Sequence, residues 1–107
     1  MDVMAFSVTT HVPDEPGTIT LAGELDLSAV TTIDAAIREA LTDSRASTVK
    51  LDLAAATFID STALGALVRG RRAAMAEGRR FVVVNPTGHV LRVLEITGVA
   101  AILMAEP

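Results

Sequence analysis

The chain has 107 residues, the usual size of one domain, and half of these residues are apolar although only three are aromatic. The absence of cysteine excludes disulfide frameworks, thiolate metal sites and cysteine nucleophiles, and the net charge of −4 argues against a general role in nucleic-acid binding. Apolar stretches all fall short of the roughly 20 residues that span a bilayer, so we expect one cytoplasmic domain over residues 1–107 without membrane association.

The first two predicted elements are the strands of a β-hairpin. Residues 6–12 and 18–21 are rich in β-branched side chains and partly alternate between polar and apolar. The segment 13–17 between them contains two prolines and a glycine, which is typical of a turn. The chain is therefore expected to open with two antiparallel strands.

A helix and a short strand are predicted next. Ser28 is well placed as the N-cap of the helix. The apolar side chains after it recur at helical spacing and form one stripe: Val30, Ile33, Ile37 and Leu41. In the strand over residues 49–53, Lys50 and Asp52 fall on the face opposite the apolar residues, which indicates a sheet with one face less buried than the other.

A second helix is predicted to begin near Ser61 and to end at Gly78. Gly65 and Gly70 inside it each cost about 0.5–1 kcal/mol relative to alanine, so close packing or a partner surface is expected at these positions. The expected apolar stripe is Leu64, Leu67, Val68 and Met75. A cluster of arginines is assigned to the solvated face of the helix rather than to a basic patch: Arg69, Arg71, Arg72, Arg79 and Arg80.

The remaining elements complete an alternation of strands and helices. A buried strand over residues 81–84 is followed by a short helix that Thr87 caps and Gly98 ends, and residues 101–104 are expected to form a last edge strand. The order ββαβαβα(β) predicts an α/β (α+β) domain. We expect a four- to five-stranded mixed sheet that opens with a β-hairpin and packs against about three to four helices.

The candidate site lies at the start of the second helix, where Asp60, Ser61 and Thr62 place three small oxygen-bearing side chains in succession. The simplest interpretation is structural, because Asp60 or Ser61 can cap free backbone N–H groups, which is worth about 1 kcal/mol. A functional interpretation is compatible with capping. A hydroxyl at a helix N-terminus is a suitable place for a phosphoryl group, since the free amides and the positive dipole end favour an anion.

The run DSTALGALV, residues 60–68, together with GELDLS, residues 23–28, resembles the paired signature of bacterial anti-sigma factor antagonists, the STAS family. The similarity extends over nearly the whole chain and implies a STAS-like fold. It also implies that Ser61 is phosphorylated by a partner kinase that is itself the anti-sigma factor, and that Asp26 lies beside Ser61 on the partner-facing surface. The partner-binding residues expected from the resemblance are Asp26, Asp60, Ser61, Thr62 and Gly65.

The sequence departs from the family at one place, because many members have DSSG where this chain has DSTA. Ala63 is a better helix former than glycine, so we expect a firmer first turn and an altered kinase preference. The serine itself is retained, which keeps Ser61 as the expected acceptor. Thr62 is a second candidate acceptor, although occupying the first turn of the helix is its more common role.

Other chemistries lack the residues that they need. His11 and His89 lie far apart in the sequence, so no metal site is expected, and no glycine-rich nucleotide-binding fingerprint is present. A phosphate-handling domain of the receiver type, with Asp60 as the acceptor, would need an acidic pair and a late lysine, but the only lysine is Lys50. We therefore expect no enzyme, no cofactor and no catalytic residue.

Two functions follow from the resemblance. In the first, the unphosphorylated protein binds an anti-sigma factor with serine kinase activity and releases its sigma factor, phosphorylation at Ser61 inactivates it, and a serine phosphatase is a further expected partner. In the second, the chain is a non-sigma STAS scaffold or interaction subunit of a stressosome-like assembly or a lipid-transport complex. Neither fixes the oligomeric state, and a weak homodimer is compatible with both.

Overall fold

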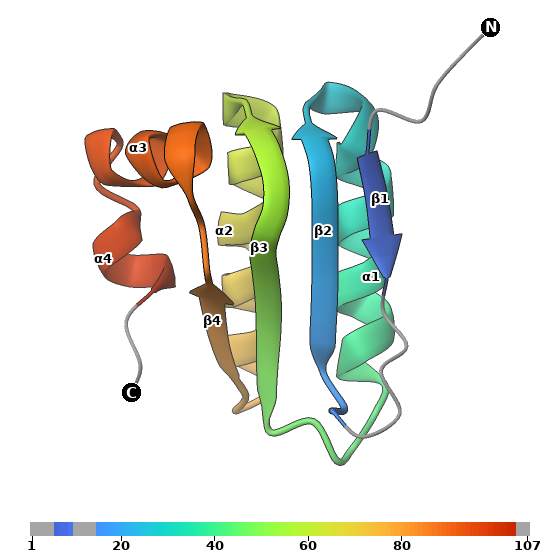
Figure 1. Cartoon of the computed structure of the whole chain (residues 1–107). Helices are drawn as coiled ribbons and strands as arrows, with labels where there is room; N and C mark the ends of the chain where they lie inside the picture. Colours follow the sequence, from blue (N-terminus) through green and yellow to red (C-terminus); the bar gives the residue numbers. More distant parts are fainter. Residues whose placement is uncertain (1–5, 10–14, 105–107) are drawn as a thin grey trace, which may run out of the picture.

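Four strands form one mixed sheet in the computed structural model, which describes residues 6–9 and 15–104 (Figure 1). The strands, in spatial order, are β1 (Phe6–Thr9), β2 (Thr18–Leu25), β3 (Thr48–Ile59) and β4 (Arg80–Val84). β1 pairs with β2 antiparallel, whereas β2, β3 and β4 run parallel. The helices are the 3₁₀ turn η1 (Leu27–Ala29), α1 (Val30–Leu41), α2 (Ser61–Ala76), α3 (Gly88–Ile96) and α4 (Ala100–Leu103). The predicted mixed α/β architecture with an opening hairpin is confirmed.

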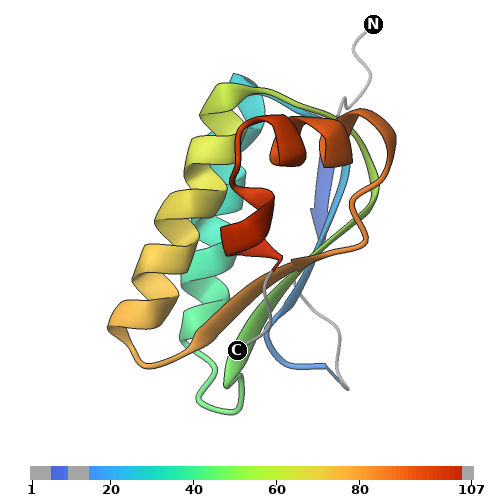
Figure 2. The same ribbon diagram turned by 90° about the vertical axis from the view of Figure 1, so that its left-hand side faces the viewer.

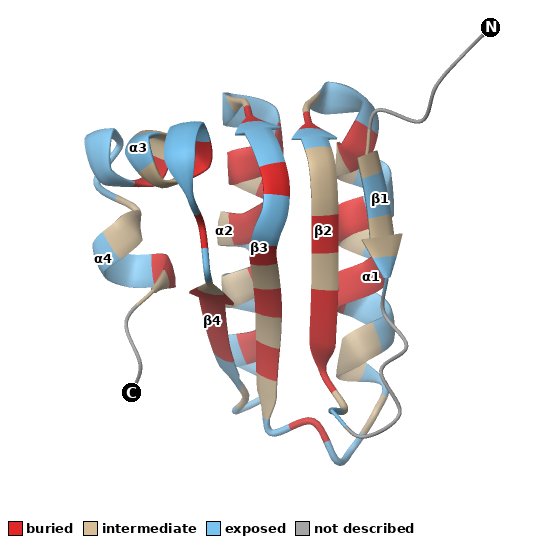
Figure 3. Ribbon diagram, viewed as in Figure 1, coloured by how far each residue is buried: buried red, intermediate tan, exposed pale blue. Residues whose placement is uncertain are grey.

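The long helices α1 and α2 lie side by side on one face of the sheet (Figure 2). The core between these two layers is almost entirely aliphatic, as the composition predicts, with Phe81 as its one fully enclosed ring among the described residues. On the other face of β3, Lys50 and Asp52 are half-buried, which confirms the expected difference between the two faces. Figure 3 shows this difference as alternating buried and half-buried bands along the first part of β3. No helix of the described ranges is long and apolar enough to cross a membrane.

Strand β3 is twelve residues long and continues to Ile59, although the sequence predicts a strand that stops at residue 53. Two irregularities in its pairing with β2 explain the difference, because at each of them β3 holds one residue more than its neighbour. The buried positions then fall at Leu53, Ala56 and Ile59, so the two-residue alternation is lost while the strand goes on. Strand β2 is also longer than predicted, since Gly23–Leu25 belong to it.

Two predictions about helix starts are corrected. Ser28 is not an N-cap: it lies inside η1, and the Asp26 carboxylate accepts hydrogen bonds from both its N–H and its hydroxyl. The acid two residues earlier is the stronger acceptor, so it caps the turn in place of the serine. Thr87 does precede α3, but its side chain makes no capping hydrogen bond.

The predicted last strand over residues 101–104 is wrong, because these residues form α4 and the turn that ends it. A short apolar run has no periodicity that separates a helix from a strand. Gly98, with a φ of 82°, ends α3 as expected and turns the chain so that Leu103 is buried against the core. The predicted strand over residues 6–12 is seen to Thr9, and its remainder lies outside the described residues.

Small residues, rather than the expected Met75, form much of the buried face of α2. The Met75 side chain is 53% exposed, whereas Ala63, Ala66 and Ala74 are buried beside Leu64 and Leu67. Gly70 has a packing reason: a Cβ atom there would lie 2.5 Å from Cδ1 of Ile37 and 3.1 Å from Cε2 of Phe81. The glycine therefore sets how closely α2 approaches α1 and β4.

The assignment of all five arginines to a solvated helix face is wrong for Arg80, which is exposed but begins β4, and for Arg79. Arg79 follows α2, is largely buried, and donates hydrogen bonds to the carbonyl oxygens of Leu41, Asp43 and Ala46 at 3.0–3.1 Å. These acceptors lie at the C-terminal end of α1 and in the loop after it, where backbone carbonyls lack helical partners. Arg79 therefore ties this loop to the start of β4.

We predict that Gly70→Ala lowers the free energy of unfolding by about 1–3 kcal/mol, because the new methyl group overlaps the buried Ile37 side chain. Gly65→Ala is the matched control, since a Cβ there meets only the Arg69 guanidinium at 3.5 Å. That variant should equal the parent or gain up to about 1 kcal/mol. Urea denaturation measures both, and equal stability of the two alanine variants would contradict the packing role of Gly70.

Candidate functional site

The candidate site is the edge of the sheet at which the parallel strands β2 and β3 end together. Leu25 and Ile59, the last residues of the two strands, are partners in the register, and the N–H of Asp60 donates to the Leu25 carbonyl at 3.1 Å. Asp26 and Asp60 thus follow adjacent strand ends. We call this edge, with Asp26, Leu27 and residues 60–62, the rim.

Asp60 joins the two halves of the rim. Its carboxylate accepts the Thr62 hydroxyl at 2.6 Å and the Ala63 N–H at 2.9 Å, which makes it the N-cap of α2. The N–H of Leu27, at the start of η1, is a lesser contributor to the electrostatics of this carboxylate. These contacts, led by that of the Thr62 hydroxyl and followed by that of the Ala63 amide, lower the pKa of Asp60 below its ordinary value. Asp60 therefore fixes the start of α2 through its carboxylate and the end of β2 through its own N–H.

Ser61 and Thr62 differ in what their hydroxyl groups do. Both residues are exposed, and Ser61 is the first residue of α2. The Thr62 hydroxyl is engaged with Asp60, whereas the Ser61 hydroxyl makes no hydrogen bond to any residue of the described ranges. The capping alternative for Ser61 is thus excluded, because Asp60 is the cap. Ser61 presents an exposed, unoccupied hydroxyl at the rim.

Asp26 lies on the rim as predicted, and it also has a structural role. It is the N-cap of η1, and its carboxylate accepts the N–H of Ser28 at 3.0 Å. Glu24, one residue before the end of β2, is exposed and adds a further carboxylate near this edge. The strand ends thus carry several carboxylates, with their side chains half-buried or exposed.

Gly65 is half-buried one helical turn after Ser61, on the same face of α2. Unlike Gly70, it has no packing reason, because a Cβ atom there would meet only Nη1 of Arg69 within 4 Å. All the predicted partner-binding residues are therefore brought to one end of the molecule: Asp26, Asp60, Ser61, Thr62 and Gly65.

Two exposed apolar side chains near the strand ends were not predicted from the sequence. Leu27 is 69% exposed between Asp26 and Ser28, and Phe58, next to the end of β3, is 39% exposed and stacks on His89 with ring centroids 5.0 Å apart. No sequence signal marks Leu27 as exposed, because it continues the two-residue alternation of the buried Ile19, Leu21 and Leu25. Exposure alone does not mark these two as a binding surface, because Met75, Ile96 and Ile102 are exposed as well.

The described ranges hold no group of three or more histidine, cysteine, aspartate or glutamate side chains that could bind a metal ion. His11 lies outside those ranges, and His89 is engaged with Phe58. The chemistry that the rim does offer is an acceptor hydroxyl on Ser61, carboxylates that accept hydrogen bonds, and an apolar contact through Leu27.

We predict that Asp60→Ala lowers the free energy of unfolding at neutral pH by about 1 kcal/mol, through loss of the cap. The folded-state pKa of Asp60 is lowered, so its stabilisation is complete above the ordinary pKa of aspartate and is lost as the pH falls through the lowered value. The difference in free energy of unfolding between the parent and Asp60→Ala should therefore become smaller as the pH falls. Asp60→Asn is the control, because it retains the cap but cannot titrate. A difference in unfolding free energy between the parent and Asp60→Ala that does not depend on pH would disprove the ionic role.

Comparisons with known proteins bear on the fold of the chain as a whole. The family model described as "Mlab, STAS domain" matches residues 8–105, and no curated protein matches the chain. The anti-sigma factor antagonist SpoIIAA in its unphosphorylated form is similar at 26% identity, over 96% of this chain and 88% of that one, with a TM-score of 0.71. The phosphorylated form of this Bacillus cell fate determinant is 25% identical over 96% and 91%, with a TM-score of 0.64.

A third similar structure is an anti-sigma factor antagonist from Mycobacterium paratuberculosis, 26% identical over 91% of this chain and 83% of that one, with a TM-score of 0.74. None of these descriptions names an enzyme. The family match covers most of the sequence, and the similar structures share its strand and helix arrangement. This chain therefore belongs to the STAS-domain family and resembles the anti-sigma factor antagonists within it.

Proposed function

We propose that this protein is an anti-sigma factor antagonist controlled by phosphorylation at Ser61. The unphosphorylated form binds an anti-sigma factor that has serine kinase activity, and this binding releases the sigma factor. Transfer of a phosphoryl group to Ser61 ends the binding, and a serine phosphatase restores the binding form. The chain acts as one STAS domain in the cytoplasm, and it needs neither a cofactor nor a catalytic group of its own.

The observation that carries the proposal is the exposed hydroxyl of Ser61, which has no hydrogen-bond partner in the described ranges and which Asp60 holds at the rim. A kinase needs such a hydroxyl, because a nucleophile already bonded within the fold must first lose that bond. The Thr62 hydroxyl is already bonded in this way, since it donates to the Asp60 carboxylate at 2.6 Å. The similar protein SpoIIAA is known in unphosphorylated and phosphorylated forms, which supports the same kind of control in this chain.

Charge explains why the modification would end binding. A phosphate adds about −1.5 to −2 charges to a rim that already holds carboxylates. At an effective dielectric constant of about 20 and a separation of about 6 Å, each unit pair repels by roughly 2.8 kcal/mol before salt screens it. The dipole of α2 offsets about 0.3–1 kcal/mol in the free protein. In a complex the phosphate also loses water, so a loss of affinity on the order of a hundredfold is expected.

A second candidate function is that of a non-sigma STAS interaction subunit. The name Mlab in the description of the matching family model favours it, because that name does not refer to a sigma factor. In that case the same rim, with Leu27 as an apolar contact, binds a subunit of a larger assembly and no phosphorylation is needed. A neighbouring gene for a kinase-like anti-sigma factor, as opposed to genes for a transporter, distinguishes the two functions.

We predict that the cognate kinase and ATP label Ser61 and not Thr62. Mass spectrometry should locate the phosphate on Ser61 in the parent and in Thr62→Val, which removes the competing hydroxyl together with its bond to Asp60. Ser61→Ala should remain unlabelled. Labelling that persists in Ser61→Ala at the parental level would show that another residue is the acceptor.

We also predict the direction of the switch. Phosphorylated protein should bind the anti-sigma factor about a hundredfold more weakly than unmodified protein, and Ser61→Glu should lose less because it adds less charge. In the presence of ATP, Ser61→Ala should keep the affinity that the unmodified parent has without ATP. Titration calorimetry measures all four forms, with Arg80→Ala, an exposed change at the start of β4, as a control for surface charge. Equal affinities of the modified and unmodified forms would refute the switch.

A further inference from the structure

The side chain of Arg69 extends along α2 in the direction of Ser61. Ser61, Gly65 and Arg69 follow one another at intervals of four residues, so they occupy one face of the helix. Side chains of a helix tilt towards its N-terminus. Nη1 of Arg69 accordingly lies only 3.5 Å from the position that a Cβ atom at residue 65 would take. The guanidinium thus lies over Gly65, one turn from the candidate phosphorylation site.

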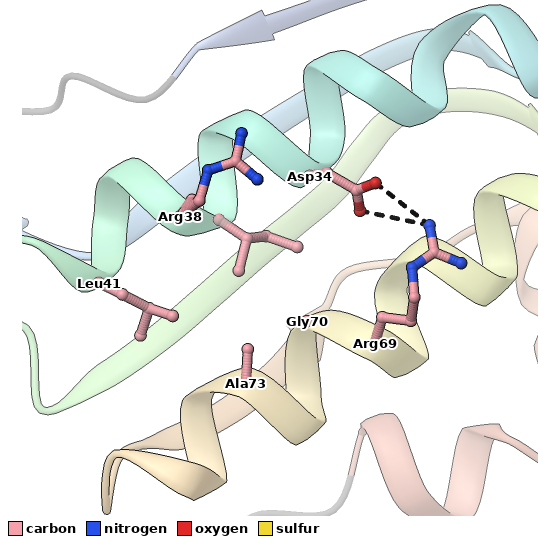
Figure 4. A pocket seen from close by; sticks show the side chains of 7 residues that line it. Asp34, Arg38, Leu41, Arg69, Gly70 and Ala73 are labelled. Carbon is pink, nitrogen blue, oxygen red and sulfur yellow. Dashed lines mark hydrogen bonds and ion pairs between the residues drawn. The ribbon is translucent and has the colours of Figure 1, made fainter.

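The present partner of Arg69 is Asp34 of α1, and the contact between them is loose. Nη2 lies 3.2 Å from Oδ2 and 3.3 Å from Oδ1 of Asp34, which is longer than the roughly 2.7–2.9 Å of a strong charge-assisted hydrogen bond (Figure 4). The Arg69 side chain is 55% exposed. Its Nη1 donates to no residue of the described ranges. Arg69 therefore has an unused donor group and a weakly held position.

Gly65 leaves the path between Arg69 and Ser61 open. Residues four apart on a helix have Cβ atoms about 5–6 Å apart, so a guanidinium above residue 65 is within one side-chain rotation of a phosphate on residue 61. Any larger residue at position 65 would fill that space, because its Cβ would already be in contact with Nη1. No packing contact requires glycine at this position, in contrast to Gly70.

We propose that Arg69 and Gly65 form a receiving site for the phosphate of phosphorylated Ser61. Arg69 leaves Asp34 and pairs with the phosphate, whose charge of about −1.5 to −2 and three acceptor oxygens compete better for a guanidinium than one carboxylate. The inference rests on the proposed function only in taking Ser61 as the residue that carries phosphate. It accounts for how the free protein tolerates a phosphate beside the carboxylates of the rim.

The pairing also carries the modification from the rim to the groove between α1 and α2. Asp34, Arg38 and Arg69 are charged residues that line this groove, which has a volume of about 280 Å³. When the Arg69 guanidinium turns to the phosphate, Asp34 loses its ion-pair partner and the groove loses a positive charge. Phosphorylation therefore alters two surfaces of the molecule and not the rim alone.

The test uses full-length protein with phosphoserine installed at position 61 during translation, so that no kinase or binding partner is needed. Titration of the phosphate by ³¹P NMR gives the pH midpoint of its second ionisation. A cation paired with the phosphate at about 4 Å in water lowers this midpoint by about 0.8 pH unit. Arg69→Ala should therefore raise it by that amount, and Arg69→Lys by less. Gly65→Leu should also raise it, while Asp34→Asn, which frees Arg69, should lower it.

Arg72→Ala is the matched control, because Arg72 is an exposed arginine of the same helix about 16 Å from Ser61 along its axis. It removes the same charge and should leave the midpoint unchanged. Equal shifts in Arg69→Ala and Arg72→Ala, or no shift in either, would overturn the proposal. The titration involves no anti-sigma factor, so failure of the proposed function would appear in the labelling and binding experiments and would leave this result intact.

Discussion

The ionised carboxylate of Asp60 is the interaction on which the candidate site depends. It accepts the Ala63 N–H and the Thr62 hydroxyl, while the backbone N–H of Asp60 donates to the Leu25 carbonyl. Strand β3, helix α2 and the end of β2 therefore meet at one residue. Because Asp60 provides the cap and occupies Thr62, the Ser61 hydroxyl is left unbonded. The same contacts that start the helix thus select which hydroxyl is available.

Close packing of α2 is the second constraint, and it separates the roles of two glycines. Gly70 lies against Ile37 and Phe81, so it serves the approach of α2 to the layers beside it. Gly65 lies in open space above which only the Arg69 guanidinium passes. Two interior glycines lower the intrinsic stability of a helix, and close packing offsets this cost only at Gly70. Gly65 is explained by the space that it leaves for the Arg69 guanidinium.

Charge is distributed unevenly although the chain as a whole is acidic. The ends of β2 and β3 bring carboxylates together, whereas α2 carries Arg69, Arg71 and Arg72. The net charge of −4 hides this division. A phosphate on Ser61 would stand between the two regions, with the rim repelling it and Arg69 within reach. This position suits a modification that the free protein tolerates and that a complex excludes.

The sequence by itself determined the α/β class, the opening hairpin and the placement of Asp60, Ser61 and Asp26, because local patterns and two short motifs carry that information. It could not determine where β3 ends, since two irregularities break the alternation without ending the strand. Nor could it show that Asp26 displaces Ser28 as the cap, or that residues 101–104 are helical. Only the three-dimensional structure decided that the Ser61 hydroxyl is unbonded and that Arg69 lies over Gly65, because both depend on side-chain conformations that the sequence pattern does not specify, and that of Arg69 also on its contact with Asp34 of α1.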